Sequence, residues 1–203
     1  MEAFVAGVIA GYGIAIPVGA IAVLIVEVGI RCGFRCAFFA GAGAATADLI
    51  YSGLAVIGCA ALAGSVQAID QPLRVFSAIV LILIAIYGLR RASTREDASG
   101  AAMPDRRELL GTYTRFVGLT LINPTTIVYF AAIIVGLGVA DEMTAGQGIL
   151  FSLGAFMASL SWQTLLAAIG GVAGDRLSPR AQTAAVVVGN LVIVAFALVI
   201  LFR

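Results

Sequence analysis

Long apolar stretches alternate with short polar ones along the chain, a pattern typical of segments that cross a membrane. A helix needs about 20 apolar residues to span the hydrocarbon core of a bilayer. The pattern predicts six spans: Ala3–Val26, Ala37–Leu62, Leu73–Leu89, Phe116–Ala140, Gly148–Val172 and Gln182–Phe202. The third is the shortest, since only Val75–Leu89 lacks charge, so Arg74 must reach towards the interface or the bilayer must thin.

Arginines gather in the first, third and fifth connections between these spans. The third connection, Arg90–Arg115, is the longest polar segment and is predicted to be a mobile loop. Ten of the twelve basic residues lie in the three connections: Arg31, Arg35, Arg90, Arg91, Arg95, Arg106, Arg107, Arg115, Arg176 and Arg180. Because arginine-rich loops stay on the cytoplasmic side, we expect these loops inside the cell and both termini outside.

Composition agrees with a membrane protein. Of the 203 residues, 62% are hydrophobic and 11% are charged, and the mean hydropathy is +1.10. A soluble domain could not cover so much apolar surface with so few charges. The sequence contains no lysine and no histidine, which excludes a P-loop or Schiff-base lysine and a histidine metal site or proton relay. Cys32 and Cys36 are predicted to be small packing residues, because a redox or metal role would need a further cysteine cluster.

Six spans divide into two groups of three. We therefore predict a first three-helix repeat at residues 1–89, a cytoplasmic arginine-rich loop at 90–115 and a second three-helix repeat at 116–203. Because three is odd, the repeats would insert with opposite orientations, as in inverted-repeat transporters. The expected fold is an all-α integral membrane protein with six transmembrane helices in an inverted 3+3 repeat, of which helices 1 and 4 are broken.

Asp48 is the only charged residue in the run Cys36–Ile69. A carboxylate at the centre of a membrane costs about 2.5–3.5 kcal/mol, and such residues usually serve transport or proton movement. We expect Asp48 to bind a substrate ammonium group, to exchange a proton, or to do both in turn. With no lysine or histidine in the chain, it is the only ionisable side chain expected near mid-membrane that can take up a proton. The alternative is a structural hydrogen bond to a Ser or Thr hydroxyl.

Two predicted spans contain a proline that would interrupt a helix. Pro17 is closely followed by Gly19 in the first span, and Asn123 precedes Pro124 and Thr125 in the fourth. Asn before Pro is typical of a helix start. A helix that restarts within the membrane directs its N–H groups and the positive end of its dipole at a bound anion such as a carboxylate. The competing interpretation of each proline is a purely structural kink.

The two breaks and Asp48 are predicted to lie at similar depth. At 1.5 Å per residue, Pro17, Pro124 and Asp48 are roughly 15, 12 and 17 Å from the arginine-rich face. A zwitterion with its carboxylate at a broken helix and its ammonium near Asp48 would fit such a site. Trp162 and Gln163 lie mid-span in the fifth segment, where they either line the same cavity or pack in the core.

Other small and polar residues favour contacts between helices. Glu27 and Arg31 are spaced for an ion pair near one end of the first span, and Asn190 is predicted to bond across helices. Two small-residue pairs allow close helix approach, within the chain or between two chains of a homodimer: Gly7 with Gly11, and Gly43 with Ala47.

Five motifs occur in an order and spacing that resemble a known family. They are Gly-Ile-Ala-Ile-Pro-Val-Gly-Ala at Gly13–Ala20, Gly-Ile-Arg-Cys-Gly at Gly29–Gly33, the glycine-rich segment Gly41–Asp48, Leu-Ile-Asn-Pro at Leu121–Pro124 and Ser-Leu-Ser-Trp at Ser159–Trp162. Together they resemble the LysE/RhtB family of bacterial amino-acid exporters. The chain departs from that family at Ala20, where a second proline is usual, and at Thr125, where many members have lysine.

The resemblance implies a transporter that exports amino acids or related small zwitterions across the bacterial inner membrane, driven by the proton motive force. It implies no enzyme activity, cofactor, metal or nucleic-acid partner; the partners are a small-molecule substrate and the lipid bilayer. The predicted substrate site comprises Pro17, Gly19, Asp48, Asn123, Pro124, Thr125 and Trp162, with Asp48 also coupling to protons.

Three other functions compete with this interpretation. One is a heavy-metal or other cation exporter on a related scaffold, but one carboxylate without histidine makes a poor metal site. Another is an intramembrane thiol–disulfide electron carrier, which would need cysteines in both halves of the chain. The last is a membrane scaffold that transports nothing.

Overall fold

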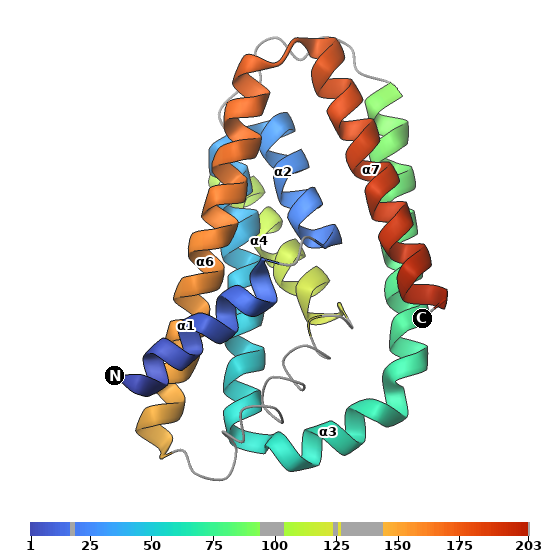
Figure 1. The fold of residues 1–203 in the computed structure, drawn as a ribbon. Coiled ribbons are helices and arrows are strands. Elements are labelled where there is room, and N and C mark those ends of the chain that lie inside the picture. The colour runs from blue at the N-terminus through green and yellow to red at the C-terminus, as the bar shows by residue number, and fades with distance from the viewer. Residues whose placement is uncertain (17–18, 94–103, 124–125, 127–143, 203) are drawn as a thin grey trace.

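A computed structural model describes residues 1–16, 19–93, 104–123, 126 and 144–202, and this part of the chain is helical without strands. Its helices are α1 (Glu2–Ala15), α2 (Ala20–Cys32), α3 (Phe34–Ser93), α4 (Arg106–Leu121), α6 (Ala145–Arg176) and α7 (Pro179–Phe202). Figure 1 shows them as an elongated bundle with α6 along one side and α7 along the other. The all-α class predicted from the sequence is confirmed for the described residues.

The first predicted span is broken, as the sequence indicates. Helix α1 ends at Ala15, and α2 begins at Ala20 after Gly19, which has an extended backbone. The two helices meet at an angle of 78°. Pro17, to which the break was assigned, lies outside the described residues, as do Pro124 and Thr125.

The second and third predicted spans are the two arms of one helix, α3, so the break expected between them is absent, whereas the two spans themselves are not contradicted (Figure 1). Helix α3 passes without interruption through the region around Asp70 that the sequence suggested as a connection. In Figure 1 it descends beside α6, turns along the base and rises beside α7. The helix includes Pro72, a residue type that bends helices without always ending them.

The polar segment Arg90–Arg115 is helical at both ends, so the prediction of a loop across all of it is wrong. Helix α4 starts at Arg106, and its first turn is fixed by a capping box. The Asp105 carboxylate accepts hydrogen bonds from the backbone N–H groups of Arg107 and Glu108, and Glu108 accepts one from the N–H of Asp105. An Asp followed three residues later by Glu is a helix-start signal that the sequence contains.

Length and composition allow two of the described helices to cross a membrane, at Phe34–Val56 and Ala145–Arg176. A third span results if the bent pair of α1 and α2 counts as one. Ala78–Tyr87 and Pro179–Ala195 are shorter apolar helices, and most of the fourth predicted span lies outside the described residues. The described structure therefore supports an all-α membrane protein but does not establish six spans.

Many large apolar side chains are exposed on the outer faces of the helices. Leu83, Tyr87, Ile149 and Val188 are each about 60% exposed, at 60%, 62%, 62% and 59%. A soluble monomer rarely exposes apolar surface on this scale. These faces are therefore suited to contact with lipid.

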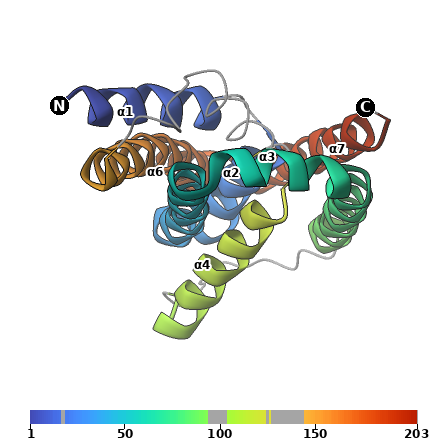
Figure 2. The ribbon, with the colours of Figure 1, turned by 90° about the horizontal axis from the view of Figure 1, so that it is seen from below.

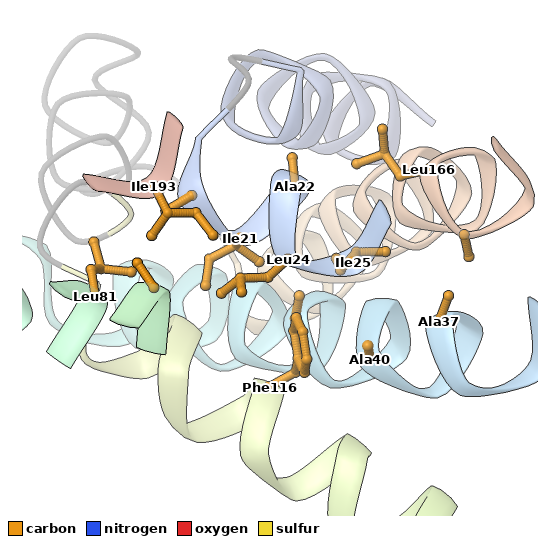
Figure 3. Packing of buried hydrophobic residues seen from close by; sticks show 14 of the residues in the cluster. Ile21, Ala22, Leu24, Ile25, Ala37, Ala40, Leu81, Phe116, Leu166 and Ile193 are labelled. Atoms are coloured by element: carbon orange, nitrogen blue, oxygen red, sulfur yellow. The ribbon is translucent and has the colours of Figure 1, made fainter. Parts of the chain in front are cut away.

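Helix α2 lies in the middle of the bundle, in contact with α3, α6 and α7 (Figure 2). Its apolar side chains reach the core from a central position, and residues of the other helices surround them (Figure 3). The labelled members of this buried cluster are Ile21, Ala22, Leu24, Ile25, Ala37, Ala40, Leu81, Phe116, Leu166 and Ile193.

Small residues allow α1 and α2 to approach α6 at backbone distance. A Cβ atom on Gly11 would lie 2.8 Å from the Cα of Ala155, and one on Gly29 would lie 2.7 Å from the Cα of Gly170. A Cβ on Gly154 would overlap the carbonyl oxygen of Phe4. The close approach predicted from Gly7 and Gly11 is thus confirmed within the chain.

A tight turn at Gly33 joins α2 to α3. Its φ of 83° lies in the left-handed region that favours glycine. The structure joins Cys32 and Cys36 across this turn in a disulfide, with Cα atoms 5.8 Å apart. The prediction that these two cysteines are only packing residues is therefore wrong.

The arginine-bearing ends of the helices lie together. Arg31 is in the last turn of α2 and Arg176 is in the last turn of α6. Figure 1 shows the α2–α3 junction, the end of α3 and the α6–α7 junction in the upper part of the molecule, whereas the turn of α3 and the start of α6 lie at the base.

Candidate functional site

Asp48 lies at the interface of α3 and α6, where its side chain is buried and only 5% of the residue is exposed. The Ser159 hydroxyl, which is fully buried, donates a hydrogen bond of 2.6 Å to Asp48 Oδ2. This is the hydroxyl bond that the sequence analysis left as an alternative. A carboxylate can accept about four hydrogen bonds, and among the described residues only Ser159 donates one to Asp48. The described residues therefore leave the other acceptor positions of Asp48 unfilled.

Sequence reasoning did not identify Ser159 as the partner of Asp48. A signal was present, because Ser152, Ser159 and Gln163 are spaced by seven and four residues and so share one face of a helix. All three are buried, at 8%, 0% and 6% exposure. A polar stripe on an apolar helix predicts a buried polar contact, although it does not name the opposite helix.

Tyr51 connects the helix that carries Asp48 to the end of α4. Its hydroxyl donates a hydrogen bond to the carbonyl oxygen of Leu121, the last residue of α4. Carbonyl groups in the last turn of a helix have no partner within the helix, so this bond satisfies one of them. The sequence analysis did not single out Tyr51. Tyr51 lies one turn after Asp48 on α3, and its acceptor Leu121 lies two residues before Asn123.

A small cavity lies where the ends of the two interrupted helices meet. Its lining comes from α2, α3 and the end of α4, and consists of Ile21, Val80, Leu81, Leu119, Ile122 and Asn123. Ile21 is two residues beyond Gly19, at the start of α2, and Asn123 follows the end of α4. The interruption predicted in the fourth span near Asn123 agrees with the end of α4 at Leu121. The structure therefore brings both breaks to one cavity, and Asn123 is its polar member.

The other predicted site residues have separate positions. Asp48 is not among the residues that line this cavity, because its side chain is bonded towards α6. Trp162 is half-buried and packs against the buried cluster around α2. The Trp162 indole Nε1 is buried without a hydrogen-bond partner among the described residues. Nothing described brings Asp48 and Asn123 into direct contact.

A second buried carboxylate lies between α2 and α7. Glu27 pairs with Arg31, with 2.9 Å between Oε1 and Nε, so the predicted ion pair is confirmed. Asn190 Nδ2 donates a hydrogen bond of 2.9 Å to Glu27 Oε2, which confirms the predicted bond across helices. Glu27 is only 9% exposed. Asp48 is therefore not the only carboxylate buried among the helices.

Comparison with known proteins assigns most of the chain to one family. Residues 13–203 match the family model of the LysE type translocators. The chain belongs to the LysE type translocator family. This match confirms the LysE-family resemblance drawn from the motifs. Members of this family are membrane exporters and not enzymes.

Two relatives have similar sequences over most of their length. The chain is 27% identical over 186 residues to the uncharacterized membrane protein YahN of Escherichia coli, which covers 91% of this chain and 82% of YahN. It is 28% identical over 168 residues to the chemotactic transduction protein ChpE of Pseudomonas aeruginosa, which covers 82% of this chain and 81% of ChpE. No solved structure matches the chain significantly.

Proposed function

We propose that this LysE-family protein exports amino acids or related small zwitterions across the bacterial inner membrane, coupled to the proton motive force. The observation that carries the proposal is Asp48, a carboxylate buried within an apolar helix with one hydroxyl as its described donor. Burial of such a group is costly, and a proton or a cation is the ligand that offsets the cost.

The cavity at the two helix breaks supports the substrate class. Its polar member is Asn123, and the N-terminal turn of α2 begins beside it. Free N–H groups at a helix start favour a carboxylate. Because Thr125 stands where many relatives have lysine, the carboxylate would be held by backbone and amide groups. The substrate ammonium would have to reach Asp48 from this cavity, which Asp48 does not line in the described structure.

The proposed architecture is the inverted 3+3 repeat, with cytoplasmic arginine-rich loops and both termini outside. Two observations support it: the interrupted helices on both sides of the cavity, and the arginine-bearing helix ends gathered at one end of the molecule (Figure 1). A homodimer would have to use faces other than the Gly7–Gly11 pair, which packs on α6.

Transport in everted membrane vesicles tests the proposal. Vesicles from cells that overproduce the protein are given a panel of radiolabelled amino acids, with and without a proton gradient. We expect gradient-stimulated uptake of at least one amino acid, and we expect Asp48→Asn to abolish the stimulation. The matched control is Asp175→Asn, at an exposed position near the end of α6, which should transport like the unmodified protein.

Two results would contradict the proposal. If Asp48→Asn vesicles, matched for protein content by immunoblot, kept the gradient stimulation, Asp48 would not couple transport to protons. If no amino acid or related zwitterion entered vesicles of the unmodified protein, the substrate class would be wrong.

A further inference from the structure

Gln163 is a buried amide that lacks a partner. The residue is 6% exposed, and its Oε1 has no hydrogen-bond partner among the described residues. An amide oxygen in an apolar interior without a hydrogen bond is costly, so an unpaired one in a native structure calls for an explanation. Gln163 lies on α6 one helical turn after Ser159, the residue that bonds Asp48.

The contacts between α3 and α6 show how these residues are ordered. A Cβ on Gly41 would lie 2.8 Å from the Cβ of Gln163, so the two helices are in close contact there. Asp48, two turns further along α3, bonds Ser159, one turn earlier on α6. Residue numbers therefore increase along α3 in the direction in which they decrease along α6, so these parts of the two helices run antiparallel. Gln163 therefore lies on the arginine-bearing side of Asp48.

The usual direction of helical side chains favours an approach of Gln163 and Asp48 towards each other. In an α-helix the Cα–Cβ bond tilts towards the N-terminus. Asp48 therefore leans back along α3 towards Gly41, and Gln163 leans back along α6 towards Ser159. The intervening turn of α3 holds Ala44 and Ala45, both fully buried, which contribute only methyl groups.

We propose that Gln163 is a second acceptor of the Asp48 site and that this site binds a primary ammonium group. Ser159 occupies one acceptor position of the carboxylate, which leaves the others for N–H donors. A primary ammonium offers three N–H donors, enough for both the Asp48 carboxylate and Gln163 Oε1. A proton on Asp48 would create a single O–H donor, whereas a primary ammonium can donate to the carboxylate and to Gln163 Oε1 at the same time. The inference rests on the proposed export of zwitterions and deepens it by assigning specificity to a named residue.

The proposal predicts discrimination by chemical class. A site built from hydrogen-bond acceptors rejects an analogue that lacks the donors, since its buried acceptors are then left unpaired. Amino acids should therefore bind, whereas their N-trimethylated betaines, which keep the charge but have no N–H group, should bind poorly.

Trp162, adjacent to Gln163, provides a direct readout because it is the only tryptophan in the chain. Purified protein in detergent is titrated with aliphatic amino acids, which do not absorb at the excitation wavelength, and with the matching betaines. We expect a saturable change in Trp162 emission with at least one amino acid, and binding of its betaine weaker by roughly tenfold or more. The concentration dependence of uptake into vesicles measures the same preference independently.

Substitution of Gln163 separates binding from folding. Gln163→Leu should weaken amino-acid binding roughly tenfold to a hundredfold, the effect of losing a hydrogen bond to a charged group. Its thermal stability should be unchanged or higher, because leucine removes an unpaired amide. Gln163→Met, unbranched like glutamine, is the second variant if leucine packs poorly. Gln163→Glu keeps an acceptor and should retain binding. The control is Thr164→Val, since the Thr164 hydroxyl bonds only the Leu160 carbonyl of its own helix among the described residues.

The outcomes distinguish this inference from the proposed function. If Gln163→Leu and Gln163→Met keep the affinity of the unmodified protein in fluorescence and in vesicle uptake, or if betaines bind as well as amino acids, the role of Gln163 is overturned although export stands. If the unmodified protein neither binds nor transports any amino acid, the proposed function fails and the inference fails with it.

Discussion

Asp48 shows how one hydrogen bond can hold a buried carboxylate without satisfying it. Ser159 fixes the orientation of the carboxylate through Oδ2, and the remaining lone pairs are left for a ligand. A more complete set of hydrogen-bond donors would stabilise the charged carboxylate but would leave no acceptor position for a substrate or a proton. The arrangement therefore suits a transporter better than a purely structural contact.

Ser159→Ala should destabilise the protein by about 1–3 kcal/mol, because the buried carboxylate then loses its described donor. Thermal unfolding in detergent measures the effect. The control on the same helix is Thr164→Val, whose hydroxyl bonds only the Leu160 carbonyl of its own helix among the described residues, and there we expect a change within about 0.5 kcal/mol.

Ser159→Ala in an Asp48→Asn background tests whether Ser159 and Asp48 interact. If the two side chains interact as the 2.6 Å bond indicates, Ser159→Ala should cost less in that background. Equal costs in both backgrounds would show that the hydroxyl contributes to stability through some other contact.

At the scale of helices, α6 provides the backbone surface on which α1 and α2 pack. Small residues on both sides replace interlocking side chains, so the helices meet at backbone distance. In lipid the hydrophobic effect does not drive helices together. Close backbone contacts stabilise the helix pair instead through van der Waals packing. The angle of 78° between α1 and α2 lets both halves of the first span use the same partner helix.

Gly154→Ala should destabilise the fold by about 1–3 kcal/mol, because its methyl group would overlap the Phe4 carbonyl and push α1 away from α6. The matched control is Gly111→Ala in α4, where a Cβ meets no atom within 4 Å. That control should be neutral or stabilising by about 0.5–1 kcal/mol, since alanine is the better helix former. A thermal unfolding midpoint that drops as much for Gly111→Ala as for Gly154→Ala would contradict this packing account.

The whole molecule has two chemically different ends. Helix α6 connects them, from Gly146 near its start to Asp175 near its arginine-bearing end. These residues are about 44 Å apart at 1.5 Å per residue, more than the roughly 30 Å of a bilayer core. They should therefore lie on opposite sides of the membrane.

Cysteine accessibility measures that orientation. Gly146→Cys and Asp175→Cys are introduced singly into a variant that lacks Cys32, Cys36 and Cys59. In intact cells a membrane-impermeant maleimide should label the cysteine at 146 and not the one at 175, and everted vesicles should show the reverse. Labelling of both from one side, or the opposite pattern, would refute the proposed orientation.

Sequence alone determined what depends on local composition. Apolar stretches without charge establish the membrane character, the segment around Pro17 and Gly19 predicts the interruption between α1 and α2, and the ordered motifs indicate the family. Asp48 is recognisable as a site candidate because any charge in an apolar run is costly wherever the helix packs. The proposed link between Asp48 and substrate or proton stays a prediction.

Tertiary structure decided what depends on helix rotation and on distant contacts. It alone shows that Asp48 bonds Ser159, that Tyr51 reaches the Leu121 carbonyl and that Asn190 bonds Glu27. It also shows that α3 continues through the expected connection around Asp70. The physical reason is the same in each case. A sequence fixes the polarity of a residue and its place along a helix, whereas the partner it meets depends on how whole helices turn and pack against one another.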